Sequence, residues 1–274
     1  MSEVSDIEWT NATWNPVTGC TKISKGCDNC YAYTFAERFR GVPGHPYERG
    51  FDVQLRPERI ALPLDWDVPK MIFVNSMSDL YHPKVPDDYI LRVFDTMNRA
   101  RQHTFQVLTK RARRLQEISG QLEWGPNIWQ GVSVESADYT WRIDALRKVP
   151  AKVRFLSLEP LLGPLPSLDL KGIHWVITGG ESGHHARPMQ VEWASEIRDQ
   201  CRRASVPFFF KQYGMLRSNP DPADPTAKEN GGATKGGRTL GGRLWGQFPR
   251  VTRSSRSDRR GAPGVPFGLR AQAR

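Results

Sequence analysis

Short apolar runs rich in Val, Ile, Leu and Phe recur along the chain from Met71 onward, and this pattern constrains the fold more than any other feature. Each run ends in polar or charged residues, and the ends, at about residues 75, 109, 133, 157, 179 and 211, are roughly 22 to 34 residues apart. Such an interval accommodates a strand, a helix and two short loops, which predicts βα units around a parallel sheet. Because the runs are almost continuously apolar, we expect the sheet to be covered on both faces.

The segments between these runs contain helical patterns. Residues 86–100 begin with Pro and two acidic residues, and their apolar side chains follow helical spacing. Similar patterns predict helices over residues 139–149 and 191–204, whereas residues 160–172 contain too much Pro and Gly for a helix.

An early strand near residues 8–18 gives about six to seven parallel strands in all. Polar residues follow nearly every strand, which favours a complete or partial TIM-type βα barrel, because the strand ends of a barrel converge on one face. An open doubly wound sheet, the alternative, would need polar residues mainly at its switch point. We therefore expect an α/β fold with a barrel over residues 1–216, a returning loop over 217–249 and a basic, largely irregular C-terminal tail, disordered over 250–274.

Positive charge is concentrated in the C-terminal region. Residues 217–274 contain twelve Lys or Arg against four Asp or Glu and so contribute eight units of the net charge of +10. A basic flexible tail is a hint of nucleic-acid binding. No apolar run is long enough for a transmembrane helix, and the first residues lack the pattern of a signal peptide, so we expect a soluble cytoplasmic protein.

Three of the four cysteines fall within eleven residues, in the segment Cys20-Thr-Lys-Ile-Ser-Lys-Gly-Cys27-Asp-Asn-Cys30. Flexible glycines at 19 and 26 would let three thiolates face one centre, which suits zinc or an iron–sulfur cluster. A structural zinc would need a fourth ligand, for which His45 is near enough in the sequence, whereas a cluster with three cysteine ligands leaves one iron open. The remaining interpretation is three unrelated buried cysteines, and Cys201, at a core position of a predicted helix, is expected to be of that kind.

Other motifs are less specific. The Gly179-Gly-Glu-Ser-Gly183 loop resembles a phosphate-binding turn, but it lacks the Walker Lys-Ser/Thr and the G-x-G-x-x-G order. His45, His184 and His185 are more typical of exposed loops than of metal ligands. Trp and Tyr are not interleaved with Arg, so the sequence indicates no base-stacking platform.

A further set of segments combines with the cysteine loop: Thr13-Trp-Asn-Pro-Val-Thr-Gly-Cys20, Phe73-Val-Asn-Ser-Met-Ser-Asp-Leu80, Gln106-Val-Leu-Thr-Lys110, Gly131-Val-Ser-Val-Glu135, Ser157-Leu-Glu-Pro-Leu161, Gly179-Gly-Glu-Ser-Gly183 and Phe210-Lys-Gln-Tyr213. With these segments the chain resembles the radical S-adenosylmethionine (radical SAM) superfamily, in a phage- and bacterium-encoded branch, over about residues 7–216. It is more distantly similar to photoproduct-lyase-type radical SAM enzymes. The usual superfamily spacing is C-x3-C-x2-C, so the six-residue interval here is a departure.

The resemblance implies a 4Fe-4S cluster and bound S-adenosylmethionine (SAM) as cofactors, with Cys20, Cys27 and Cys30 as the cluster ligands. Residues at the strand ends are implied to bind SAM: Asn75, Ser76 and Asp79 its amino group, Lys110 its carboxylate, Ser133 and Glu135 its ribose, and Gly179, Gly180 and Glu181 in a further contact. Glu159, Lys211 and Gln212 remain as candidate catalytic residues toward the substrate.

The implied activity is reductive cleavage of SAM, with an electron from a donor such as ferredoxin or flavodoxin. The cleavage gives methionine and a 5′-deoxyadenosyl radical that attacks a substrate, with a nucleic acid or nucleobase favoured and repair or modification as the outcome. The alternative is a non-catalytic zinc or iron–sulfur protein that binds nucleic acid.

Overall fold

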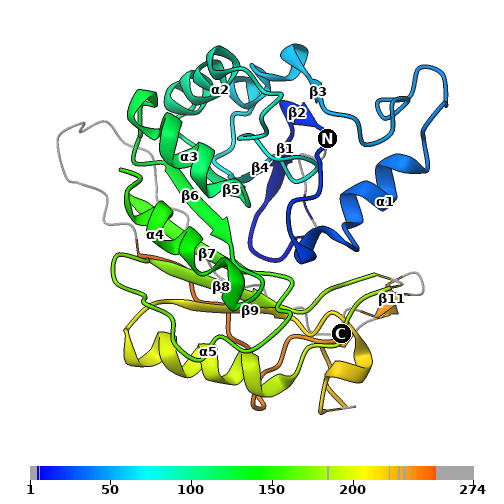
Figure 1. Ribbon diagram of the computed structural model, residues 1–274, viewed down its shortest axis with the longest axis vertical. Coiled ribbons are helices and arrows are strands. Elements are labelled where there is room, and N and C mark those ends of the chain that lie inside the picture. Colours follow the sequence, from blue (N-terminus) through cyan, green and yellow to red (C-terminus); the bar gives the residue numbers. More distant parts are fainter. Residues whose placement is uncertain are drawn as a thin grey trace.

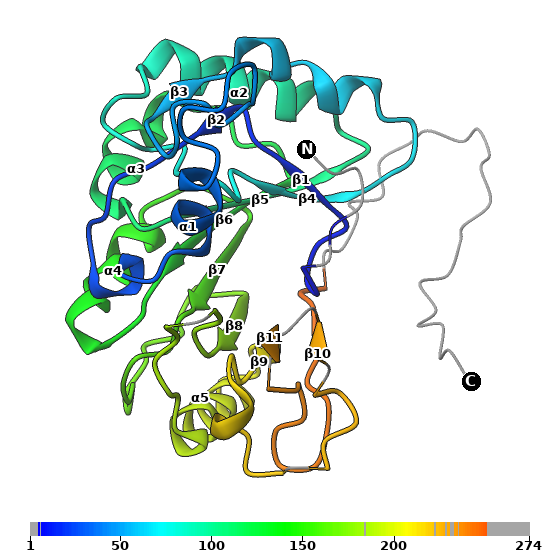
Figure 2. The same cartoon turned by 90° about the vertical axis from the view of Figure 1, so that its right-hand side faces the viewer.

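The computed structural model describes residue 5 and residues 7–183, 185–221, 223–227, 229–230, 233–234 and 236–250. In this part of the chain, seven parallel strands form one sheet in their order along the sequence. They are β1 (Ala12–Trp14), β4 (Met71–Val74), β5 (Thr104–Thr109), β6 (Ile128–Ser133), β7 (Val153–Leu158), β8 (Trp175–Gly179) and β9 (Phe208–Gln212). The sheet curls into a half-barrel (Figures 1 and 2). The expected parallel α/β architecture is confirmed, and the consecutive strand order is that of a partial barrel rather than of a doubly wound sheet.

Four helices lie along the outer face of the curled sheet (Figure 1). They are α2 (Asp87–Arg99), α3 (Ala112–Ile118), α4 (Trp141–Arg147) and α5 (Val191–Arg203). Three of them match the helices expected from the sequence, and the connection between β7 and β8 contains no helix, as its Pro and Gly content predicts. A further helix, α1 (Tyr31–Glu37), follows the cysteine segment and faces the viewer in Figure 2, in front of the strands.

Shorter elements complete the described part. β2 (Val17–Thr18) pairs antiparallel with β3 (Gln54–Leu55), and β10 (Glu229–Asn230) pairs antiparallel with β11 (Ala233–Thr234). The single early strand expected near residues 8–18 is therefore divided between β1 and β2, which belong to different sheets. The 3-10 turns are η1 (Lys25–Cys27), η2 (Pro57–Arg59), η3 (Leu62–Asp65), η4 (Ser119–Gln121), η5 (Ala137–Tyr139) and η6 (Leu216–Ser218).

The two faces of the sheet pack into separate apolar clusters. Ile72 and Val74 of β4 join the large cluster under the outer helices, whereas Phe73 between them joins an aromatic cluster on the inner face. The same alternation holds in β7 and β8, as expected for a strand period of two. The inner cluster consists of Trp9, Phe73, Trp129, Val153, Phe155, Trp175, Ile177 and Phe209. Both faces are therefore buried, which explains why the strands have few polar residues before their last one or two positions.

The segment after β9 returns to the sheet. The backbone amide of Phe210 donates to the carbonyl oxygen of Trp245 at 2.9 Å, and Leu240 and Trp245 are buried. Residues 251–274, which carry most of the expected disordered tail, lie outside the described residues. Among the described helices, none combines the length and the apolar character needed to cross a bilayer.

Candidate functional site

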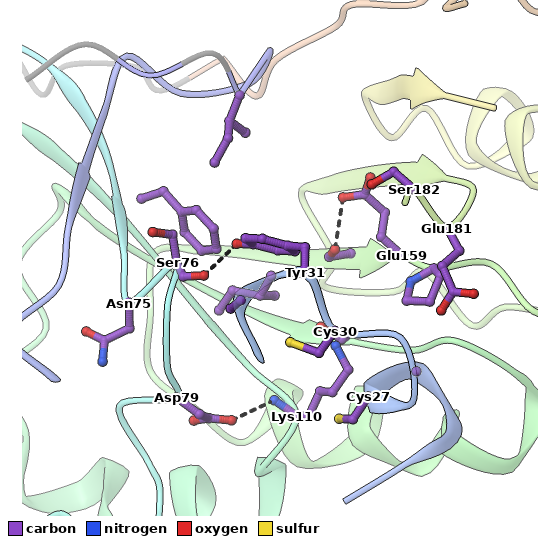
Figure 3. A pocket seen from close by; sticks show the side chains of 18 of the residues that line it. Cys27, Cys30, Tyr31, Asn75, Ser76, Asp79, Lys110, Glu159, Glu181 and Ser182 are labelled. Atoms are coloured by element: carbon purple, nitrogen blue, oxygen red, sulfur yellow. Dashed lines mark hydrogen bonds between the residues drawn. The ribbon is translucent and has the colours of Figure 1, made fainter. Parts of the chain in front are cut away.

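A pocket of about 470 Å³ opens at the carboxyl ends of the strands (Figure 3). The cysteine segment and the ends of β4 to β9 contribute its walls. It brings together most of the residues singled out from the sequence: Cys20, Cys27, Cys30, Asn75, Ser76, Asp79, Lys110, Ser133, Glu159, Gly180, Glu181, Lys211 and Gln212. Glu135 and Gly179, the other two, are not among the pocket-lining residues.

Strand alternation explains part of this convergence. Asn75, Lys110 and Ser133 stand two residues beyond the inner-face positions Phe73, Leu108 and Gly131. Side chains two residues apart on a strand share a face. Only Ser133 lies within its strand, whereas Asn75 and Lys110 follow the last residues of β4 and β5 and are placed in the pocket by the loops that begin there.

The cysteine segment is held against the strand ends by a tight turn. Gly19 has φ of +82°, and a Cβ there would lie 2.1 Å from the carbonyl oxygen of Asp52, so only glycine fits. All three cysteines of the segment are free thiols and half-buried. Burial raises the pKa of the Cys20 thiol to about 11, and the Asp79 carboxylate acts in the same direction, whereas the Arg111 guanidinium opposes both.

Arg111 connects a pocket carboxylate to the cysteine segment. Its Nη2 lies 3.6 Å from Cys20 Sγ and donates to the carbonyl oxygen and Oγ1 of Thr21, and its Nε lies 3.8 Å from Asp79 Oδ2. A fixed guanidinium beside Cys20 favours the thiolate, which is the form that binds metal.

His82 supports the same segment through Thr21. Its Nδ1 accepts a hydrogen bond from the Lys84 amide at 3.1 Å, so its Nε2 carries the proton and donates to Thr21 Oγ1 at 2.9 Å. Burial lowers the pKa of His82 to about 4, with Arg111 acting in the same direction. The neutral ring therefore serves as a hydrogen-bond donor at neutral pH.

The pocket offers three half-buried thiols of one segment, and thiolates can bind either zinc or an iron–sulfur cluster. In the described residues no three His, Cys, Asp or Glu side chains are grouped closely enough to hold one metal ion. A four-iron cluster needs no such tight group, because each of its cysteines binds a different iron. His45, the fourth zinc ligand suggested by the sequence, stacks on Phe39 with ring centroids 3.8 Å apart and accepts from the Tyr47 amide. His185 is exposed, and His184 lies outside the described residues.

Asn75 and Asp79 differ in how fully their oxygen atoms are used. Both oxygens of Asp79 accept from Thr109 Oγ1, at 2.7 and 2.9 Å, and the backbone amides of Tyr81 and Lys110 donate to them as well. Asn75, which has φ of +63° at the end of β4, donates through Nδ2 to Ser78 Oγ, but its buried Oδ1 has no donor among the described residues. Asn75 therefore keeps a buried acceptor without a donor in the described part of the chain, whereas Asp79 supports the loop.

Ser76 lines the pocket. Its carbonyl oxygen accepts a hydrogen bond from the hydroxyl of Tyr31, whose ring extends across the pocket in Figure 3. Its hydroxyl contacts the amide of Asn15 at 3.1 Å.

Charged groups face the pocket from β5, β7 and β9. Lys211 Nζ lies 3.5 Å from Glu159 Oε1, and Ser157 Oγ lies 3.3 Å from Glu159 Oε2. In Figure 3 the Lys110 side chain points toward the cysteine segment. Gln212 is buried, and its Oε1 has no donor in the described part of the chain.

The two glycines at the end of β8 approach protein atoms closely. A Cβ at Gly180 would lie 1.9 Å from the carbonyl oxygen of Tyr213, and one at Gly179 would lie 2.6 Å from Glu159 Oε1. Their small size thus makes room for the β9 backbone and for the candidate catalytic carboxylate.

Glu181 and Glu135 are both buried and bonded to arginines. Burial opposes ionisation of Glu181, but hydrogen bonds from Arg187 and Asn29 outweigh it and lower its pKa. Glu135 has no exposed surface, and its oxygens contact Arg142 and Ser24, away from the pocket. Ser133, whose carbonyl oxygen also accepts from Arg142, stays in the pocket lining.

The family model described as "Protein of unknown function (DUF5131)" matches residues 4–249, which is most of the chain. The chain belongs to the DUF5131 family. The match includes every pocket-lining residue and ends before the last Arg-rich stretch. No significant match was found among curated proteins or among solved structures.

Within this DUF5131 chain, the structure adds residues that sequence reasoning missed: Ser24, Tyr31, His82, Arg111 and Arg187. Arg111 directly follows the Leu-Thr-Lys strand end, and Tyr31 directly follows Cys30, so their positions were a usable signal. Ser24 had none, because it acts on Glu135, 111 residues away, and nothing in the sequence indicates that Arg187 joins nearby Glu181 to the distant Asp28.

Proposed function

We propose that this protein is an iron–sulfur enzyme that reductively cleaves SAM to start radical chemistry on a nucleic acid or nucleobase. Its half-barrel would then be a partial TIM-type barrel of the radical SAM kind. One observation carries the proposal: three thiols of one short segment line the same pocket as two lysines and as Asn75 and Gln212, each of which has a buried acceptor atom without a donor among the described residues. A structural metal site would need neither the lysines nor the acceptor atoms.

The three thiols would hold the cluster, with Cys20 assisted by Arg111 at 3.6 Å. When bound, the cluster supplies one electron that breaks a carbon–sulfur bond of SAM, giving methionine and a 5′-deoxyadenosyl radical. A ferredoxin or flavodoxin would provide that electron.

Pocket residues would orient the methionine part of SAM. Asn75 Oδ1 would accept a hydrogen bond from the amino group, because it is a buried acceptor that lacks a donor within the described part of the chain. Lys110 would pair with the carboxylate as a point charge. Ser76 and Ser133 would contribute hydroxyl contacts, the latter toward the ribose.

The substrate would lie on the side of the pocket formed by β7 and β9. Glu159 and Lys211, paired at 3.5 Å, can hold a proton between Oε1 and Nζ, and Gln212 Oε1 can accept from a substrate N–H or O–H. Trp9, Phe73 and Leu108 give this pocket apolar walls that exclude water, which protects a reactive radical from side reactions.

Metal analysis of protein purified without oxygen tests the proposal. We expect a brown protein with about four irons and as many sulfides per chain. A colourless protein with one zinc per chain would contradict it and favour the alternative, a non-catalytic zinc protein that binds nucleic acid.

A further inference from the structure

A buried ion pair lies beneath the cysteine segment. Arg142 Nη1 donates to Glu135 Oε2 at 2.6 Å, with both side chains almost completely shielded from solvent, at 2% and 0% exposure. The Arg142 guanidinium also lies over the Tyr139 ring, 4.2 Å from its centroid. A buried pair of this kind is costly to separate, so the carboxylate is fixed in place.

The second oxygen of Glu135 faces the cysteine segment rather than the pocket. It accepts a hydrogen bond from the hydroxyl of Ser24, 111 residues earlier in the chain. Gly26 passes so close that a Cβ there would lie 2.6 Å from this oxygen. The segment therefore packs directly onto the carboxylate in two places.

Ser24 in turn contacts Cys27. The backbone amide of Cys27 donates to the Ser24 carbonyl oxygen at 2.9 Å, which closes the turn η1, and Ser24 Oγ lies 3.7 Å from Cys27 Sγ. The hydroxyl has one proton and donates it to the carboxylate, so toward Cys27 it offers only its oxygen. Ser24 thus adopts one orientation, and Cys27 has one position relative to β6.

We propose that Glu135, backed by Arg142, is a positioning residue for the cysteine segment that acts on Cys27 through Ser24. This assigns Glu135 to the support of the metal-binding segment and not to contact with a ribose. The proposal rests on the proposed function only for the identity of the group that Cys27 binds.

Hydrogen exchange in the full-length purified protein tests the link, followed by mass spectrometry of peptides covering residues 24–28. In Ser24→Ala we expect amide exchange about tenfold faster, because a hydrogen bond to a charged group is lost. Ser24→Thr should restore the wild-type rate, since Ser24 has the extended backbone, φ −153°, that β-branched residues favour. Glu135→Asp keeps a carboxylate for Arg142, but the shorter side chain no longer reaches Ser24, so it should accelerate exchange as Ser24→Ala does. In the double variant, Ser24→Ala with Glu135→Asp, exchange should be no faster than in either single variant.

Asp224→Asn is the matched control, because it removes a buried carboxylate whose partners among the described residues all belong to the segment after β9. It should lower stability without faster exchange at residues 24–28. After iron loading, Ser24→Ala should also lose iron to a chelator faster than Ser24→Thr.

Unchanged exchange in Ser24→Ala, additive effects in the double variant, or equal acceleration in Asp224→Asn would overturn the proposal. Failure of the proposed function is distinguishable, because protein that binds no iron would still show the exchange pattern.

Discussion

Cys27 and Cys201 present the same thiol group in opposite surroundings. Cys27 is half-buried and lines the pocket, whereas Cys201 is fully buried within α5, where burial raises its pKa to about 12. Cys201 is packed in the large apolar cluster and is not a pocket-lining residue, so it cannot reach a metal held by the cysteine segment.

Replacing Cys27 with Ala should abolish iron loading, because two thiolates hold a four-iron cluster poorly. Cys201→Ala is the matched control and should leave iron and sulfide content unchanged. Iron and sulfide assays on both variants check this. Normal loading of Cys27→Ala would show that the ligands are assigned wrongly.

Asp224 organises the segment that returns to β9. It is buried and accepts hydrogen bonds from the hydroxyls and amides of Thr226 and Thr239 and from Asn219. Burial alone would raise its pKa, but these hydrogen bonds outweigh burial and lower the pKa to about 2.

A lowered carboxyl pKa adds stability that is fully present above the unfolded pKa of 3.8 and is lost as pH falls through about 2. The difference corresponds to about 2 kcal/mol. Urea unfolding at pH 7 should therefore show that Asp224→Asn is less stable than the wild type by roughly that amount. This difference in the free energy of unfolding should become smaller at pH 2. A gap independent of pH would contradict the assignment of the low pKa to this carboxylate.

At the scale of elements, the polar strand ends depend on close packing between β8 and β9. The backbone of Gly180 passes beside that of Tyr213, and the register of the two strands shifts at Thr178 and Gly179. This contact sets where Lys211 and Gln212 stand relative to Glu159.

Gly180→Ala should destabilise the fold by about 1–3 kcal/mol, because its Cβ would collide with backbone that cannot easily move. Gly120→Ala, where a Cβ meets nothing within 4 Å, should change stability by less than about 0.5 kcal/mol. Thermal or urea unfolding measures both. Equal stabilities would mean that the β8–β9 contact is looser than described.

The strands and outer helices could be predicted because their signals are local. The runs ending at Asn75, Thr109 and Ser133 coincide with β4, β5 and β6, since an apolar run with polar ends reports burial directly. α1 could not be predicted in the same way, because Tyr31, Tyr33 and Phe35 are exposed and give no amphipathic pattern.

The location of the polar strand ends was also readable, since parallel strands converge at one edge. The sequence does not show which of those side chains keep an oxygen or nitrogen atom free of hydrogen bonds within the protein. Asp79 and Glu135 look equivalent to Asn75 in the sequence, but Thr109 and Ser24 occupy their oxygens. Such pairings join residues 30 and 111 positions apart, and no periodicity encodes them.

At the scale of the whole molecule, contacts between distant parts of the chain join the walls of the pocket. Arg187, after β8, donates to the Lys25 carbonyl oxygen at 2.8 Å and lies 3.3 Å from Asp28 of the cysteine segment. The same guanidinium bonds to Glu181. The early segment and the late strands therefore form one site, although the described sheet remains open.

Truncation after Arg250 removes six arginines and one aspartate, so five net positive charges are lost. If this region recruits nucleic acid, truncation should weaken binding and flatten the slope of log K against log salt, by up to roughly 0.9 per lost phosphate contact. Catalysis at saturating substrate should survive, because every pocket residue precedes Gly214. Titrations of DNA and RNA at several salt concentrations measure the slopes for the full-length and truncated proteins. Equal slopes would show that residues 251–274 do not contribute to nucleic-acid binding.

The most direct test of the central claim is formation of 5′-deoxyadenosine by reconstituted, dithionite-reduced protein supplied with SAM, with and without DNA or RNA. We expect 5′-deoxyadenosine and methionine from the wild-type chain, none from Cys27→Ala, and faster formation with the nucleic acid that serves as substrate. A wild-type protein that carries the complete cluster and leaves SAM intact under all these conditions would contradict the account.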